Sequence, residues 1–117
     1  MGVSLVVTSL LYYNIEEETK KEYAMPTEYE KMIAGDFYKP SDPELRALAA
    51  SSREKQWAFN AEPDRLKRAE IVKSWFGSTG ENVAMNPQFV TDYGVNIHIG
   101  ENFYSNWNLT MLDICPI

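Results

Sequence analysis

The chain offers few side chains that could act as a base or as a nucleophile. His98 is its one histidine and Cys115 its one cysteine among 117 residues. A neutral imidazole can accept a proton near physiological pH, and a thiolate can attack a carbonyl carbon. One residue of each kind excludes an internal disulfide, a cysteine zinc cluster and any site that needs two histidines. A histidine-based mechanism within this chain would therefore have to use His98.

A second group with possible chemistry is a set of basic residues in a segment that we expect to be helical. On such a helix these side chains most simply form a solvated face, with a phosphate site as the less favoured alternative. The residues are Arg65, Lys67, Arg68 and Lys73.

Composition limits the class of protein in which these residues act. Hydrophobic residues make up 44% of the chain and charged residues 24%, which argues against disorder, collagen and a membrane-embedded protein. The net charge of -6 has the wrong sign for binding the phosphates of nucleic acid or an anionic membrane surface. We therefore expect a soluble, cytoplasmic protein with no bound metal and with neither nucleic acid nor membrane as a partner.

The two ends of the chain do not read as parts of a complete domain. Residues 1–24 are expected to be an N-terminal extension, in which the apolar run Val3–Tyr13 is too short to span a bilayer. At the other end, the apolar stretch that closes at Ile117 carries no glycine, cap or polar tail. This pattern favours a truncated sequence.

Three helices are predicted between the extension and Gly77. Thr27 and Glu30 have the spacing of a capping box, and Gly35 is a suitable C-terminal stop for a short first helix. Asp42 followed by Pro43 begins a second helix, which we expect to run to about residue 60. A third helix is expected from residues 63–64 to residue 76.

The inner faces of these helices are predicted from apolar spacing. Trp57 and Trp75 are expected to pack between the helices. The third helix should bury a stripe that consists of Leu66, Ala69, Val72 and Phe76.

After Gly80 the helical spacing disappears and a six-residue repeat begins. A period of six with two inward positions is typical of a three-sided parallel β-helix, in which each hexad supplies one face and one corner. Asn96, Asn102 and Asn108 recur at the fourth position, where a corner requires left-handed backbone geometry. The expected inward residues are Tyr93, Ile99, Ser105, Met111 and Ile117 at the first position, and Ile97, Phe103, Leu109 and Cys115 at the fifth. Cys115 is thus expected to be a buried small hydrophobe rather than a nucleophile.

Three segments resemble the maltose/galactoside O-acetyltransferases, a family of hexapeptide-repeat acyltransferases. They are residues 30–38 (Glu-Lys-Met-Ile-Ala-Gly-Asp-Phe-Tyr), 92–108 (beginning Asp-Tyr-Gly-Val-Asn-Ile-His-Ile-Gly) and 112–117 (Leu-Asp-Ile-Cys-Pro-Ile). The resemblance implies an α+β fold, with a helical maltose-acetyltransferase-type cap over residues 25–80. Residues 81–117 would then form the first coils of a left-handed parallel β-helix, truncated after them.

The resemblance also implies a reaction, the transfer of acetyl from acetyl-CoA, as co-substrate, to a sugar hydroxyl. Members of the family are homotrimers with active sites between subunits. Their histidine base lies on a later coil, in a Thr-x-x-His-Pro-like segment that has no counterpart up to Ile117, and the coils that bind CoA also lie further on. His98 falls in a different motif and is expected to point outward or to pack at a corner, so we expect no catalytic and no CoA-binding residue in this chain, and no acetyl transfer by this chain alone.

Four acceptor-side residues can be carried over from the family. Asn106 matches an asparagine that faces the sugar, and Tyr104 matches an aromatic wall of the sugar pocket. Asp92 lies where the family has a small polar or acidic contact. Asp113 lies near a further family carboxylate, which the galactoside type places one residue later, at Ile114, so a maltose-like acceptor is favoured. Each residue also has a structural alternative, as a corner residue for Asn106 and Asp113 and as a packing residue for Tyr104.

Two other classes of protein remain open. A non-catalytic module for trimer assembly or sugar binding would use the same coils, and a degenerate gene product would have no activity. Reading the coding DNA beyond Ile117 separates them, because a continuing frame with a His-Pro segment supports the enzyme.

Overall fold

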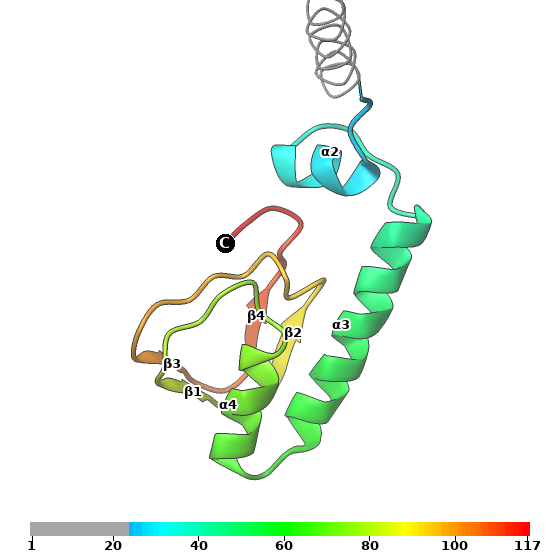
Figure 1. The fold of residues 1–117 in the computed structure, drawn as a ribbon. Helices are drawn as coiled ribbons and strands as arrows, with labels where there is room; N and C mark the ends of the chain where they lie inside the picture. Colours follow the sequence, from blue (N-terminus) through cyan, green and yellow to red (C-terminus); the bar gives the residue numbers. More distant parts are fainter. Residues whose placement is uncertain (1–23) are drawn as a thin grey trace, which may run out of the picture.

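The computed structural model describes residues 24–117, which form three helices followed by short strands (Figure 1). The elements are α2 (Glu28–Ala34), α3 (Pro43–Ala61), α4 (Arg65–Lys73), β1 (Val83–Met85), β2 (Phe89–Thr91), β3 (Phe103–Ser105) and β4 (Leu109–Met111). The predicted change from helix to short strand near Gly80 is confirmed. The prediction of an N-terminal extension falls almost entirely outside the described residues. No helix among residues 24–117 is both long and apolar enough to cross a bilayer.

The helices begin where the capping signals predicted. Thr27 Oγ1 accepts from the Glu30 backbone N–H at 3.1 Å, and the Glu30 carboxylate accepts from the Thr27 N–H at 3.3 Å. Asp42 caps α3 through the Glu44 N–H, with Pro43 in the first turn. Because these side chains satisfy N–H groups that lack a partner within the helix, each cap stabilises its helix by about 1 kcal/mol.

The strands wind into a parallel coil that advances by 20 residues. Val83 pairs with Phe103 and Phe89 pairs with Leu109, while an isolated bridge joins Ser78 to His98. These three parallel contacts in each turn agree with a three-sided β-helix. The strict hexad register predicted a turn of 18 residues, and that prediction is wrong by two residues.

The two additional residues lie in the corner after β2. The centres of successive contacts are six residues apart from Ser78 to Ala84 and from Ala84 to Val90, but eight apart from Val90 to His98. In this corner Gly94 has a φ of 75°, and a Cβ there would lie 2.0 Å from the indole nitrogen of Trp75. Asn102 and Asn108 adopt the predicted left-handed geometry, with φ of 58° and 62°. Asn96 does not, because Gly94 makes the turn in its place.

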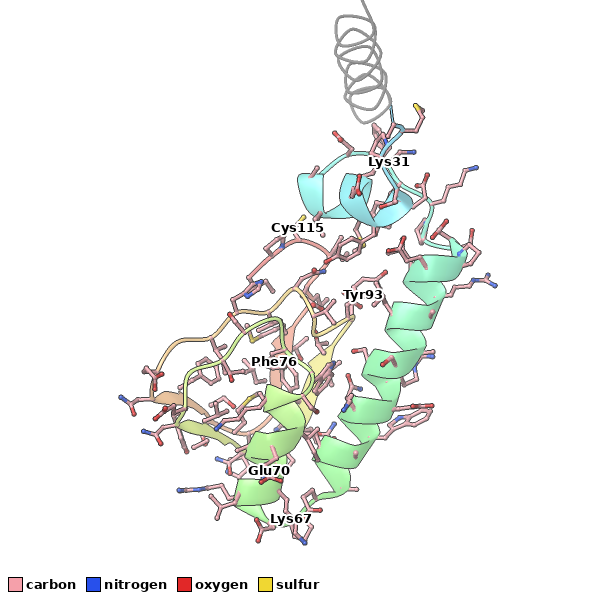
Figure 2. All side chains as sticks on the ribbon, viewed as in Figure 1. Lys31, Lys67, Glu70, Phe76, Tyr93 and Cys115 are labelled. Atoms are coloured by element: carbon pink, nitrogen blue, oxygen red, sulfur yellow. The ribbon has the colours of Figure 1, made fainter. Side chains whose placement is uncertain are left out.

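Two hydrophobic clusters hold the helices on the coil. In the larger cluster Phe89 lies 5.5 Å from Trp75 and 6.0 Å from Phe59, measured between ring centroids. The smaller cluster joins Met32 and Leu45 to Tyr93, which lies on the side of the coil that faces α3 (Figure 2). Tyr93 is therefore buried as predicted, but it packs against the helices.

Several predicted faces are wrong. Trp57 and Leu66 are exposed, whereas Trp75 is buried as expected. Arg68, expected on the solvated face, is buried at 7% exposure because its guanidinium donates to the carbonyls of Glu62, Pro63 and Met85. Cys115 and Ile117, expected inside the coil, are exposed.

Candidate functional site

The Tyr104 ring lies on the outer face of the coil beside α4. It belongs to β3 and is 63% exposed, and its hydroxyl accepts a 3.3 Å hydrogen bond from Asn86 Nδ2. With residues of α4 and β1 it lines a cavity of about 440 Å³. Asn106 follows β3 directly and is exposed, so its amide is open to a ligand. The alternative role of Tyr104 as a packing residue is not supported at this exposure.

The Asp92 side chain lies at a second place, between the end of β2 and α3. It lines a cavity of about 260 Å³ together with Arg53 and Gln56 of α3. Gln56 Oε1 accepts from the Thr91 backbone N–H at 3.0 Å, which fastens the end of β2 to the helix. Burial, with a smaller contribution from the negative charge of Asp113, raises the pKa of Asp92 above its usual range.

Asp113 is fully buried, which contradicts the expected contact with an acceptor. Its Oδ1 accepts from Thr91 Oγ1 at 2.7 Å and from the Tyr93 backbone N–H at 2.8 Å. Its Oδ2 accepts from the Asn96 backbone N–H at 3.1 Å. Because the carboxylate is enclosed and occupied by groups of this chain, a sugar cannot reach it. These partners place Asp113 against the corner that follows β2.

The structure does not bring the remaining three candidates into one pocket. The cavity that contains Tyr104 and the cavity that contains Asp92 share no residue. Tyr104 lies on the β1–β3 sheet, whereas Asp92 follows β2, which belongs to the separate β2–β4 sheet. A single copy of the chain therefore presents two partial surfaces, each with part of the candidate acceptor site: one contains Asp92 and the other contains Tyr104.

His98 points outward, as predicted. Its Nδ1 lies 2.8 Å from Ser78 Oγ across the two turns of the coil, and both residues are exposed. No carboxylate in residues 24–117 hydrogen-bonds this imidazole. The Cys115 thiol is also exposed and lies 3.6 Å from the Met32 carbonyl oxygen beside α2 (Figure 2). In the described part of the chain, no three histidine, cysteine, aspartate or glutamate side chains are grouped closely enough to hold a metal ion.

Sequence reasoning missed the contribution of α3 to the Asp92 cavity. Ala49, Arg53 and Gln56 all line it, at spacings of four and three residues that place them on one helix face. The placement of Arg53 and Gln56 on one helix face was readable from the sequence. Its partner was not, because only the tertiary structure places α3 against β2.

The chain is similar to known acetyltransferases in sequence and in structure. A model of the maltose acetyltransferase hexapeptide capping motif matches residues 31–80. The sophorolipid acetyltransferase of Starmerella bombicola is 40% identical over 100 residues, covering 76% of this chain and 39% of that protein. The crystal structure of a maltose O-acetyltransferase from Clostridium difficile 630 matches with a TM-score of 0.76 and 35% identity, over 80% of this chain and 51% of that one.

A third similarity is to a structure that contains coenzyme A. A structure of galactoside acetyltransferase in complex with coenzyme A matches with a TM-score of 0.70 and 33% identity, over 80% of this chain and 47% of that one. The chain thus spans about half the length of the two solved structures. It spans 39% of the sophorolipid acetyltransferase.

Proposed function

The chain belongs to the maltose/galactoside O-acetyltransferase family, and from this premise we propose that it is the acceptor-side part of an acetyl-CoA-dependent sugar O-acetyltransferase. The observation that carries the proposal is the Asp92 cavity, in which a partly buried carboxylate is open to a ligand on a fold shared with maltose O-acetyltransferase. We place the protein in the cytoplasm, where acetyl-CoA is available.

Each acceptor residue has a role that fits its chemistry. Asp92 accepts hydrogen bonds from sugar hydroxyls, and Arg53, across the same cavity, donates to sugar oxygens. The exposed amide of Asn106 donates to the acceptor or to the developing oxyanion. The exposed ring of Tyr104 supplies a flat apolar wall for one face of a sugar.

The reaction is an acyl transfer from a thioester to an alcohol. A histidine on a coil later than Ile117 takes the proton of the sugar hydroxyl as the oxygen attacks the thioester carbonyl. The tetrahedral intermediate then collapses, the C–S bond breaks, and the CoA sulfur leaves with the proton from the histidine. The left-handed coils that carry this histidine and bind CoA would stack on β3 and β4. The chain of residues 1–117 should therefore transfer no acetyl group by itself.

The separation of the two partial surfaces supports a site shared between copies. One copy would supply Asp92 and Arg53, and a neighbour would supply Tyr104 and Asn106. In a closed ring, every interface would contain one complete acceptor site. We propose a homotrimer, as in the family that the sequence resembles.

An assay on a coil-restored protein tests the proposal. Residues 24–117 would be joined to the coils that follow the equivalent point in the Clostridium difficile maltose O-acetyltransferase, and acetyl transfer to maltose and glucose would be measured. We expect sugar-dependent release of CoA by the joined protein and only background hydrolysis by the 117-residue chain. A folded joined protein that binds sugar without acetylating it would instead support a non-catalytic sugar-binding module.

A further inference from the structure

The buried carboxylate of Asp113 has no role in the function proposed so far. It is enclosed completely, and its three hydrogen-bond donors are neutral groups of this chain. Within residues 24–117, the one ion pair joins Lys31 to Glu28 and lies elsewhere. Burying a carboxylate without a cation is costly, and a neutral side chain could fill a structural corner at lower cost. The placement of this charge therefore calls for a specific reason.

Two of the three donors flank Asp92 in the chain. The Thr91 hydroxyl and the Tyr93 backbone N–H both donate to the same oxygen, Asp113 Oδ1. On the opposite side, Gln56 of α3 holds the Thr91 backbone N–H. The backbone on both sides of Asp92 is thus fixed, while the Asp92 carboxylate itself makes no hydrogen bond to any described residue.

We propose that Asp113 is a positioning residue, which holds Asp92 in the geometry needed for acceptor binding and keeps a fixed negative charge behind it. This inference rests on the proposed function, to which it adds a residue that touches no substrate. The clamp fixes the direction in which Asp92 enters its cavity. The buried charge of Asp113 makes the Asp92 carboxylate bind a proton more strongly than an isolated carboxylate would. It also strengthens a hydrogen bond that a sugar hydroxyl donates to Asp92.

The charge and the clamp can be separated by substitution. Asp113→Asn removes the charge and keeps Oδ1 for Thr91 and Tyr93, although its amide group then faces the Asn96 N–H. Thr91→Val keeps the charge and removes one arm of the clamp at nearly constant volume. Thr91→Ser restores the hydroxyl, so it is the conservative variant that should recover most of the loss.

The first experiment follows the Asp92 carboxyl by NMR titration in the coil-restored protein labelled with carbon-13 at aspartate. Among residues 24–117, the other charged or titratable groups near Asp92 are Arg53 on α3 and Tyr93, and both are unchanged in these variants. We expect the pKa of Asp92 to fall in Asp113→Asn, because a nearby like charge is gone, and to stay close to wild type in Thr91→Val. An Asp92 titration that is the same with and without the Asp113 charge overturns the proposal.

The second experiment measures sugar and acetyl-CoA kinetics in the coil-restored protein. Thr91→Val should raise the KM for the sugar roughly fivefold, the effect of about one hydrogen bond, and leave the KM for acetyl-CoA unchanged. If Asp92→Asn raises the sugar KM and Thr91→Val does not, the positioning role is wrong while the proposed function stands. If Asp92→Asn itself has no effect on the sugar KM, the acceptor assignment of Asp92 fails, and the positioning role fails with it.

Discussion

The hydroxyl of Tyr29, in the first described helix, donates a hydrogen bond to the side-chain oxygen of Asn96, which lies 67 residues later in the long corner of the coil. The amide nitrogen of the same Asn96 donates to the Asp113 backbone carbonyl at 2.8 Å. One asparagine therefore ties the helical cap to both turns of the coil. Burial raises the pKa of Tyr29, with smaller contributions from the charges of Asp113 and Glu44, so its hydroxyl keeps its proton at neutral pH.

Removal of the Tyr29 hydroxyl should loosen this connection. Tyr29→Phe should lower the free energy of unfolding by about 1 kcal/mol, because a partly buried acceptor on Asn96 loses its donor. Chemical denaturation measures this change. Tyr38→Phe is a matched control in the same cluster, since the Tyr38 hydroxyl bonds to no described residue. Equal effects in the two variants would show that the bond to Asn96 contributes nothing specific.

The buried Arg68 predicts a larger loss of stability. Arg68→Met should lower the free energy of unfolding by about 2–3 kcal/mol, because the carbonyls of Glu62, Pro63 and Met85 lose their donors. The exposed neighbour Lys67 provides the control, and Lys67→Met should change stability by less than about 0.5 kcal/mol. A small effect of Arg68→Met in urea unfolding would contradict the buried placement of its guanidinium.

The stability contribution of Asp92 should depend on pH in a defined direction. Its pKa is raised in the folded chain from the usual 3.8, so the charged form is disfavoured relative to the unfolded chain. Stability is therefore lost as pH rises from near 3.8 through the raised pKa of the folded state. Asp92→Asn should stabilise the chain at pH 7 and do so less as the pH falls toward 4. Asp36→Asn, at an exposed loop, is the control for the removal of one negative charge from the chain. A pH-independent effect of Asp92→Asn would refute the assignment.

The 117-residue chain should self-associate when it is produced alone. β3 and β4 each pair with one strand on one side, and Leu112, Ile114 and Ile117 are between 40% and 57% exposed. An unpaired strand edge beside apolar side chains favours pairing with another chain. Light scattering at tens of micromolar should detect a mixture of oligomers for the 117-residue chain. The coil-restored protein, measured in the same way, should give a single species. A stable monomer of the 117-residue chain would contradict this expectation.

The helices were predictable because their start signals are local. A capping box or an Asp-Pro pair acts within one helical turn, and the structure places both as expected. The buried face was less predictable, because apolar spacing does not identify what a helix packs against. Leu66 fits an apolar stripe yet is exposed. Arg68 is buried because its guanidinium donates to carbonyls of two separate segments, the adjacent Glu62 and Pro63 and the distant Met85.

The coil was predicted in kind but not in detail. The six-residue repeat is local, and it indicated parallel coils. The two additional residues between Val90 and His98 could not be recognised from the sequence, because Tyr93 and Ile97 still fit the inward positions of the repeat. The candidate site shows the same limit. Residue-by-residue resemblance identified Asp92 and Tyr104, but only the fold shows that they line separate cavities and that Asp113 is enclosed.

The proposed acceptor site is assembled from two copies of the chain, and a mixing experiment tests this assembly most directly. Asp92→Asn and Asn106→Ala would be made separately in the coil-restored protein, and the two variants would be unfolded together and refolded as mixed oligomers. In a ring with random mixing, about one interface in four combines an intact Asp92 from one copy with an intact Asn106 from its neighbour. We predict that acetyl transfer at sugar concentrations below the KM, strongly reduced in each variant alone, rises in the mixture toward about a quarter of the unsubstituted activity. No recovery in mixed oligomers would show that Asp92 and Asn106 do not complete one site across an interface.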